Sequence, residues 1–281
     1  MHTSQYLIFS SYAKINLFLH IVGKRADGYH NLQTWFQFID LKDSLGFVST
    51  AGKSGLKLEN TITMHHEKYN LIFKAFMAMR PFSKKQIGIS IFLKKRIPIG
   101  AGLGGGSSNA ATVLIALNKI WKCGLSQQEL INIGAKLGAD VPIFLFKQAA
   151  WAEGIGEKLT PKSYIEQYAL IIKPNFHIST VELFSNPDLK INCPLLERSK
   201  ILNIESLDNI FFELIKKKHS GIERTFQNLP DKNKLRLTGS GSCFYLLNPN
   251  IKVLLKNQSK LEKSVDSWIV KTLNFIPTKV S

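Results

Sequence analysis

The run PIGAGLGGGSSNAA at residues 98–111 constrains the fold more than any other stretch of the chain. Within seven positions it contains five glycines, namely Gly100, Gly102, Gly104, Gly105 and Gly106. An alternating apolar run at 87–93 precedes it and predicts a half-buried strand, and apolar residues at helical spacing follow it over 110–121. The sequence therefore predicts a strand, a glycine-rich loop and a helix in direct succession.

A loop of this kind indicates a phosphate-binding site. Where no Cβ atom intrudes, successive backbone N–H groups can converge on one anion. The helix that follows adds unpaired N–H donors and about half a positive charge at its N-terminus. Ser107 and Ser108 add hydroxyls that could donate to phosphate oxygens or ligate magnesium, and no acidic residue lies between Gly100 and Gln128. A flexible linker would not lead directly into an alanine-rich helix.

Two other phosphate-binding loops do not fit the sequence. Three of the glycines match G-x-G-x-x-G, but a dinucleotide fold needs an acidic residue about 20 positions further on to hold the ribose. The first acid, Glu129, instead forms a predicted capping box with Ser126. Gly-Lys-Ser at 52–54 is not a Walker loop, because Gly46 stands one residue too far upstream.

Composition narrows the class of protein. The chain has 281 residues, a hydrophobic content of 44% and a net charge of +17. The basic residues are spread along the chain without an aromatic-studded run, so we expect small anionic substrates and no nucleic-acid partner. No segment approaches a membrane span, and three cysteines far apart form neither a disulfide framework nor a zinc pattern. We expect a cytoplasmic protein with no membrane partner and no protein-held metal.

The glycine run resembles the second signature of the GHMP kinase superfamily. The segment SYAKINLFLH at 11–20 resembles the first signature, and RLTGSGSCFYLL at 236–247 resembles the third. The resemblance implies an α+β, two-domain GHMP kinase fold, with a ribosomal-protein-S5-like N-terminal domain and a ferredoxin-like C-terminal domain. Polar residues at 160–163 predict the boundary, giving an ATP-binding kinase domain at 1–163 and a second domain at 164–281.

Two residues carry the chemistry that this resemblance implies. Lys14 and Asn16 share one face of a predicted strand, where a lysine either faces water at a sheet edge or meets an anion. In the family both residues face the acceptor hydroxyl. Asp140, in the segment GADVP, reads as a turn or cap residue by itself, but its flanks resemble those of the catalytic aspartate. The resemblance makes Asp140 the general base and Lys14 the cation that stabilises the developing alkoxide.

The resemblance also implies ATP and Mg²⁺ as cofactors, with the triphosphate held by the glycine loop. An asparagine and a basic residue lie near the adenine in the family, although capping of a helix explains Asn70 equally well. The nucleotide contacts implied in this sequence are Asn70, Lys95, Pro98, Gly100, Ala101, Gly102, Leu103, Gly104, Gly105, Gly106, Ser107 and Ser108. Asn109 departs from the pattern, since many relatives have aspartate there.

The segment RADGYHNLQT at 25–34 resembles one branch of the superfamily, the diphosphocytidyl-methylerythritol kinases. There, the tyrosine and histidine flank and hydrogen-bond the cytosine of the substrate, which corresponds to Tyr29 and His30. Phe184 would stack on the cytosine opposite Tyr29, although packing in the core explains Phe184 equally well. The substrate contacts implied are Asn16, Tyr29, His30, Thr180, Phe184, Gly239 and Ser240.

The expected reaction is therefore ATP-dependent phosphorylation of the 2-hydroxyl of 4-diphosphocytidyl-2-C-methyl-D-erythritol, in the non-mevalonate pathway of isoprenoid biosynthesis. The alternative within the superfamily is another small-molecule kinase of the homoserine or mevalonate type. The Tyr29–His30 pair and Phe184 argue against that alternative. We expect a monomer or a weak homodimer.

Overall fold

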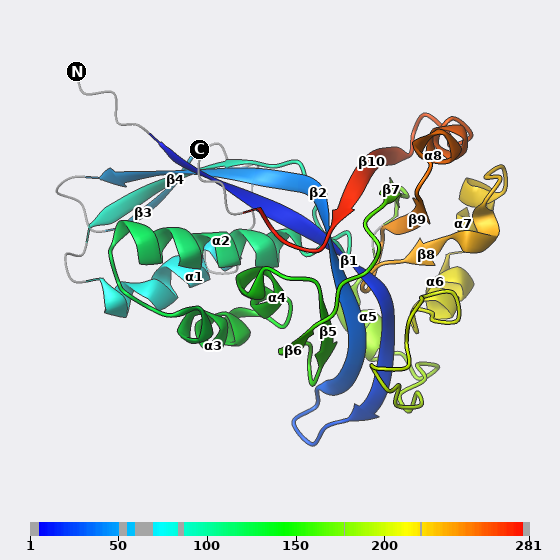
Figure 1. Cartoon of the computed structure of the whole chain (residues 1–281), viewed down its shortest axis with the longest axis horizontal. Helices are drawn as coiled ribbons and strands as arrows, with labels where there is room; N and C mark the ends of the chain where they lie inside the picture. The colour runs from blue at the N-terminus through cyan, green and yellow to red at the C-terminus, as the bar shows by residue number, and fades with distance from the viewer. Residues whose placement is uncertain are drawn as a thin grey trace.

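The structure is a computed structural model that describes residues 6–50, 55–59, 70–83, 87–176, 178–219 and 221–277. The Gly-Lys-Ser run at 52–54 lies outside these residues. Two long antiparallel strands, β1 (Leu7–Lys24) and β2 (His30–Thr50), run through the molecule and link its two halves (Figure 1). None of the described helices is long and apolar enough to cross a membrane.

The N-terminal half is a sheet with helices packed on one face (Figure 1). Its further elements are β3 (Leu56–Glu59), α1 (Leu71–Met79), η2 (Arg80–Phe82), β4 (Gly88–Lys94), α2 (Gly105–Ile120), α3 (Gln127–Leu137), α4 (Val141–Phe146), β5 (Ala150–Glu153) and β6 (Lys158–Pro161). The predicted strand, loop and helix are confirmed as β4, residues 95–104 and α2. Ile89 and Ile91 of β4 are fully buried in one core with Val113 and Leu117 of α2. The glycine loop is thus held between two well-packed elements.

The C-terminal half has an antiparallel sheet of strand order β10-β7-β9-β8. Its elements are β7 (Tyr168–Lys173), α5 (Thr180–Phe184), α6 (Phe212–Lys218), α7 (Gly221–Phe226), η3 (Lys232–Lys234), β8 (Arg236–Leu237), β9 (Phe244–Asn248), α8 (Ile251–Gln258) and β10 (Asp266–Leu273). Helices separate β7 from β8 and β9 from β10, which is the β-α-β-β-α-β order of a ferredoxin-like unit. The predicted α+β class and ferredoxin-like unit are confirmed.

The strand β7 shows how the two halves pack together. Because side chains alternate along a strand, Leu170 and Ile172 face the core that contains the helices of the C-terminal half. Ala169 and Ile171 face the opposite way, into a core shared with Ile15 and other residues of β1. This second core also contains Cys243, so it holds residues 238–243 of the third signature against β1.

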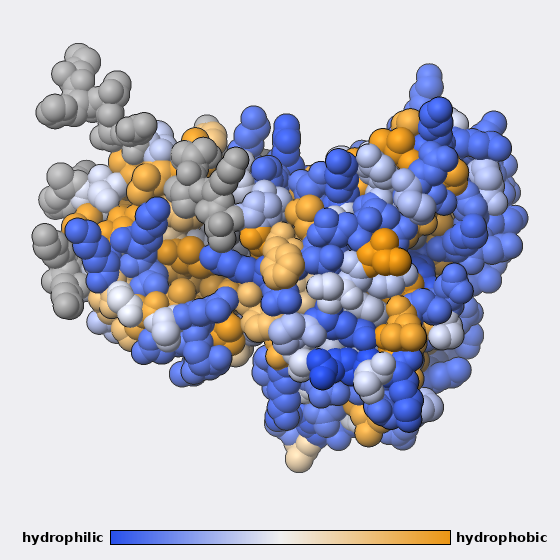
Figure 2. Space-filling model, viewed as in Figure 1, coloured by the Kyte–Doolittle hydropathy of each residue, from blue (hydrophilic) through white to orange (hydrophobic). Residues whose placement is uncertain are grey.

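The last strand joins the sheets of both halves. β10 pairs with β7 from Asp266 to Lys271 and with β2 through Thr272 and Leu273. Further on, the N–H of Ile276 donates to the carbonyl of Lys147. The C-terminal segment therefore returns to the first half of the chain, and a domain boundary at residue 163 stays a prediction. Hydrophilic side chains are spread over both halves on the face seen in Figure 2, in agreement with the even distribution of charge along the sequence.

Candidate active site

The glycine loop follows a backbone path that requires glycine. The φ angles of Gly100, Gly102 and Gly104 are 64°, 75° and 70°, in the left-handed region. Gly104 is the N-cap of α2 and provides no side-chain cap, and the first turn of α2 contains no acidic residue. The N-terminal amides of this 16-residue helix are therefore left without a capping side chain or a carboxylate, as an anion site requires.

Gly102 also lies in direct contact with the C-terminal half. A Cβ atom on Gly102 would lie 2.2 Å from the carbonyl oxygen of Thr238 and 3.0 Å from that of Gly241. Conversely, a Cβ on Gly239 would lie 3.1 Å from the carbonyl oxygen of Gly102. The second and third signatures therefore pack backbone against backbone, and the predicted site residues Gly239 and Ser240 lie beside the loop.

We expect Gly102→Ala to lower the free energy of unfolding by about 2–4 kcal/mol, because alanine is strained at this φ and its Cβ must displace the turn at Thr238. Urea unfolding measures the change. Gly106→Ala is the matched control, since a Cβ there would meet only Leu71 Cδ1 at 3.6 Å, an ordinary contact. Equal losses in the two variants would contradict the assignment of a close approach to Gly102.

Lys14 extends from β1 to the inner side of the loop. Its Nζ atom lies 3.2 Å from Asp140 Oδ2 and donates to Asn16 Oδ1 at 2.6 Å and to the carbonyl oxygen of Gly102 at 3.1 Å. Its own N–H donates to the carbonyl of Leu103. The side chain is only 3% exposed. A buried ammonium with three oxygen partners agrees with a site lysine and excludes a lysine at an exposed sheet edge.

Asp140 occupies the N-cap position of α4, yet its side chain makes no capping hydrogen bond. The carboxylate instead faces Lys14 and is 36% exposed, so one side of it meets solvent. The predicted pair from residues 126 positions apart is thus brought together next to the glycine loop. A carboxylate and an ammonium in this arrangement can accept a proton and stabilise an oxyanion at the same place.

Asn16 and Thr238 fix the position of Lys14. Asn16 is buried, its Nδ2 donates to Thr34 Oγ1 at 2.8 Å, and its N–H donates to Thr238 Oγ1 at 3.0 Å. Thr238 Oγ1 also lies 3.3 Å from the carbonyl oxygen of Gly102. The sequence analysis did not single out Thr238, although it lies inside the third signature. Its role as a link between β1 and the loop depends on contacts that the sequence does not show.

The structure corrects the expectation for the Ser108 hydroxyl. Ser108 is buried, and its Oγ donates to the carbonyl of Tyr12 at 2.6 Å and lies 2.7 Å from Ser11 Oγ. Its single proton is therefore used within the protein, and the side chain fastens α2 to β1. Asn109 accepts from Ser11 at 2.7 Å and is also buried. Ser107 is half-buried on the same turn and keeps the predicted place at the loop.

The two residues predicted near the adenine have structural partners. The Oδ1 of Asn70 accepts from the N–H of Ile72 at 2.9 Å, so Asn70 caps α1 as expected. Lys95 pairs with the buried Asp43, with 2.5 Å between Nζ and Oδ2. A Cβ on Gly105 would lie 3.1 Å from that Nζ, so the ammonium lies at the start of α2. The remaining loop residues, Pro98, Ala101 and Leu103, lie between Lys95 and α2.

Four of the seven predicted substrate residues form two pairs of neighbouring side chains. The rings of His30 and Phe184 lie 5.4 Å apart between centroids, and the hydroxyls of Thr180 and Ser240 lie 2.7 Å apart. Phe184 therefore faces His30, whereas Tyr29 is 61% exposed at the preceding turn. Burial, and then the charge of Lys24, lower the pKa of His30 below its usual value. A neutral imidazole at neutral pH can both donate and accept a hydrogen bond.

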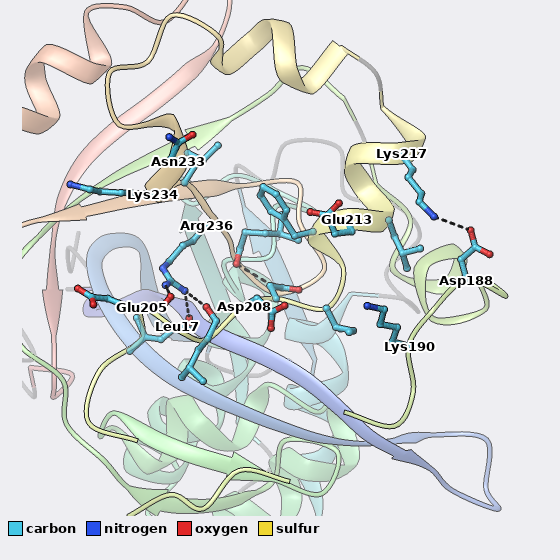
Figure 3. A pocket seen from close by; sticks show the side chains of 17 residues that line it. Leu17, Asp188, Lys190, Glu205, Asp208, Glu213, Lys217, Asn233, Lys234 and Arg236 are labelled. Atoms are coloured by element: carbon cyan, nitrogen blue, oxygen red, sulfur yellow. Dashed lines mark hydrogen bonds and ion pairs between the residues drawn. The ribbon is translucent and has the colours of Figure 1, made fainter. Parts of the chain in front are cut away.

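A cavity away from these residues lies in the C-terminal half (Figure 3). It measures about 530 Å³ and is lined by charged residues such as Lys190, Asp208 and Arg236, but by none of the predicted site residues. The guanidinium of Arg236 already donates to the carbonyls of Leu207 and Ile204. We therefore place the candidate active site at the glycine loop and the Lys14–Asp140 pair and not at this cavity. Main-chain amides and this ion pair can bind phosphate and accept a proton without a deep cavity.

No group of three or more histidine, cysteine, aspartate or glutamate residues that could hold a metal ion occurs in the described part of the chain. Mg²⁺ in nucleotide sites usually keeps several waters and binds substrate phosphates with one or two protein oxygens, so it does not need such a group.

Known proteins share this fold and much of this sequence. Residues 70–148 match the family of GHMP kinase N-terminal domains. A crystal structure of mevalonate kinase from Methanococcus jannaschii has the same fold, with a TM-score of 0.64 at 17% identity over 98% of this chain and 100% of that one. The fold is that of a GHMP kinase, and the protein is a small-molecule kinase.

Closer relatives define the branch. The 4-diphosphocytidyl-2-C-methyl-D-erythritol kinase of Francisella tularensis is 47% identical over 95% of this chain and 96% of its own length. The enzyme of that name from a Marinomonas species is 41% identical over 95% of this chain and 87% of its own. A crystal structure of 4-(cytidine 5'-diphospho)-2C-methyl-D-erythritol kinase superposes with a TM-score of 0.78 at 27% identity, over 95% of this chain and 99% of that one. The chain belongs to the family of 4-diphosphocytidyl-2-C-methyl-D-erythritol kinases.

Proposed function

We propose that the protein transfers the γ-phosphoryl group of ATP to the 2-hydroxyl of 4-diphosphocytidyl-2-C-methyl-D-erythritol, giving the 2-phosphate and ADP. This is the reaction expected in the non-mevalonate pathway of isoprenoid biosynthesis. The observation that carries the proposal is the Lys14–Asp140 pair, 3.2 Å apart, at the inner edge of the glycine loop. Membership of the kinase family supplies the substrate.

Phosphoryl transfer requires mainly that the reacting groups are aligned and that charge is neutralised. Asp140 takes the proton of the acceptor hydroxyl as general base while the oxygen attacks the γ-phosphorus and the bond to ADP breaks. Lys14 stabilises the developing alkoxide, and its bonds to Asn16 and Gly102 hold it in place. The partly exposed carboxylate leaves room for a substrate beside a buried, fixed ammonium.

The triphosphate lies along the uncapped amides of α2 and the loop before it, with Lys95 close to the first helical turn. The Ser107 hydroxyl is a further donor. Ser108 contributes by holding α2 against β1, because its hydroxyl is already bonded to β1. Magnesium, when it accompanies ATP, neutralises charge on the phosphate oxygens.

His30, Phe184, Thr180 and Ser240 recognise the cytidine end of the acceptor. Two rings already in contact and two paired hydroxyls provide stacking surface and hydrogen-bonding groups in one place. Tyr29 is exposed on the turn next to His30, where its ring can close on the base. No hydrogen bond, ion pair or ring contact joins these side chains to Lys14 or Asp140, so base recognition and the reacting centre use different residues.

His30→Ala should raise KM for the diphosphocytidyl acceptor about tenfold and change kcat by less than about threefold, because the ring contacts the remote cytosine. Initial rates of ADP release at varied acceptor concentration measure both constants. His219→Ala is the matched control, since His219 also stacks on a phenylalanine, Phe176, at 4.5 Å. An unchanged KM in His30→Ala would remove His30 from the site.

A panel of acceptors tests the proposed function against other GHMP kinase activities. Purified protein is incubated with ATP, Mg²⁺ and either 4-diphosphocytidyl-2-C-methyl-D-erythritol, homoserine or mevalonate, and ADP release is followed with coupling enzymes. We expect turnover with the first acceptor only. Faster release with homoserine or mevalonate would replace the proposal with that activity.

We further propose that the reaction takes place in the cytoplasm. All three cysteines are free, which is typical of a reducing compartment. A monomer or weak homodimer stays the prediction for the oligomeric state.

A further inference from the structure

A buried carboxylate lies beneath the start of the glycine loop. Asp43, on β2, is fully buried. Its Oδ2 lies 2.5 Å from Lys95 Nζ, and its Oδ1 accepts from the N–H groups of Arg96 at 2.7 Å and Ile97 at 2.8 Å. All three donors belong to the segment by which the chain leaves β4 for the loop. Asp43 therefore fixes both the path of the main chain and the position of one ammonium.

The Lys95 ammonium lies at the N-terminus of α2, where a helix does not favour positive charge. A Cβ on Gly105, the first residue of α2, would lie 3.1 Å from Lys95 Nζ, and the Lys95 side chain is only 12% exposed. The N-terminus of a helix carries partial positive charge, so it repels a nearby cation. Without a counter-charge the flexible lysine side chain would leave for solvent. Asp43 is the counter-charge that keeps it there.

The same face of the β1–β2 pair holds the other end of the loop. Ser11 is the cross-strand partner of Asp43, and directly opposed residues share a face of the sheet. Ser11 Oγ lies 2.7 Å from Ser108 Oγ and 2.7 Å from Asn109 Oδ1, in the first turns of α2. One pair of neighbouring strand residues thus fastens the start of the loop through Asp43 and its end through Ser11.

We propose that Asp43 is a positioning residue for nucleotide binding, which holds the Lys95 ammonium over the first turn of α2 so that it meets the phosphates of the nucleotide and not the adenine that the family resemblance implies. The proposal rests on the proposed function, in that the anion is the phosphate chain of ATP. A carboxylate that acted only through its charge would repel the phosphates, and removing the charge of Asp43 would then tighten nucleotide binding. A positioning role requires the opposite, because removing that charge weakens nucleotide binding.

The test uses Asp43→Asn, which keeps an acceptor for the N–H groups of Arg96 and Ile97 and removes the charge that holds Lys95. Isothermal titration calorimetry with Mg²⁺ and ADP measures Kd, and steady-state rates give KM for each substrate. We expect Kd for ADP and KM for ATP to rise about tenfold, with KM for the acceptor unchanged. Lys95→Met should show a similar loss, and the double variant should bind no more weakly than Lys95→Met alone.

Asp40→Asn is the matched control on the same strand. Asp40 also accepts a backbone N–H, from Lys271 of β10 at 2.8 Å, but it is exposed and bonds to no residue of the loop. Its Kd for ADP should equal that of the wild type. A purely structural role for Asp43 would lower the melting temperature of Asp43→Asn without changing Kd.

Two results would overturn the inference: an ADP affinity in Asp43→Asn equal to or tighter than wild type, or a loss that adds in full to that of Lys95→Met. If Asp43→Asn alone does not fold, the double variant, which leaves no unpaired buried charge, is compared with Lys95→Met. Equal affinities then support the inference, and a further loss overturns it. Failure of the wild type to use the diphosphocytidyl acceptor would refute the proposed function instead.

Discussion

Asp140→Asn is expected to lower kcat about 10³-fold, while Kd for ADP changes by less than about twofold. The amide keeps the size of the side chain and a contact to Lys14, but it cannot accept the proton of the acceptor hydroxyl. The carboxylate makes no capping hydrogen bond to α4, so its replacement removes no support from that helix. Coupled ADP release measures kcat, and calorimetry with ADP measures binding on the same preparation.

Asp40→Asn controls for the loss of one negative charge elsewhere on the protein. It should retain wild-type kcat, because Asp40 is exposed and bonds only to the backbone of β10 at Lys271. Wild-type turnover in Asp140→Asn would show that Asp140 is not the base. A loss of ADP affinity as large as the loss in kcat would show instead that Asp140 supports the nucleotide site.

Lys14→Met is expected to lower kcat by about 10² to 10³-fold with little change in either KM. Methionine fills the same buried space but carries no charge to stabilise the alkoxide. The substitution also leaves the carbonyl of Gly102 with only its contact to Thr238. Initial rates at saturating ATP and acceptor check the prediction, and a thermal melt confirms that the variant folds.

The double variant Lys14→Met/Asp140→Asn separates two explanations of these losses. If the pair acts as one unit, the double variant should be about as slow as the slower single variant. Independent roles would multiply the two losses. Lys42→Met is the matched control. Lys42 lies over the ring of Tyr12 as Lys14 lies over that of Phe36, but it forms no ion pair with Asp140. A Lys14→Met enzyme with wild-type kcat would remove the ammonium from the mechanism.

The sequence predicted the local part of the site well. Strand, loop and helix follow from periodicity and glycine spacing within 40 residues, and they are confirmed as β4, 95–104 and α2. The capping box at Ser126 and Glu129 is confirmed for the same reason, because both partners belong to one helical turn. The proximity of Lys14 to Asp140 came from the resemblance, since periodicity alone left Lys14 either at an edge or in a site.

Residues whose partners are distant in sequence could not be predicted. Asp43 reads as an isolated acid in a long strand until the structure places Lys95, 52 positions away, against it. Thr238 bonds to Asn16 across 222 positions. The error for Ser108 has the same origin, because its hydroxyl donates to the carbonyl of Tyr12 on β1, 96 positions away. A single sequence gives the residue types and their local periodicity, but it does not give these cross-chain distances.

The substrate side illustrates the same limit. The resemblance implied that Phe184 stacks on the cytosine opposite Tyr29. In the structure its ring contacts His30 and Phe211, and it packs partly against the core, as the second interpretation allowed. Stacking on the cytosine stays a prediction.

Product analysis tests the central claim most directly. The purified protein is incubated with ATP, Mg²⁺ and 4-diphosphocytidyl-2-C-methyl-D-erythritol, and the products are examined by phosphorus-31 NMR and mass spectrometry. The account predicts one new phosphomonoester resonance on the methylerythritol carbon 2, an intact diphosphate and one ADP per product. ADP formed with inorganic phosphate and no phosphorylated acceptor, or a phosphate on another hydroxyl, would contradict the assignment of Lys14 and Asp140 to this acceptor.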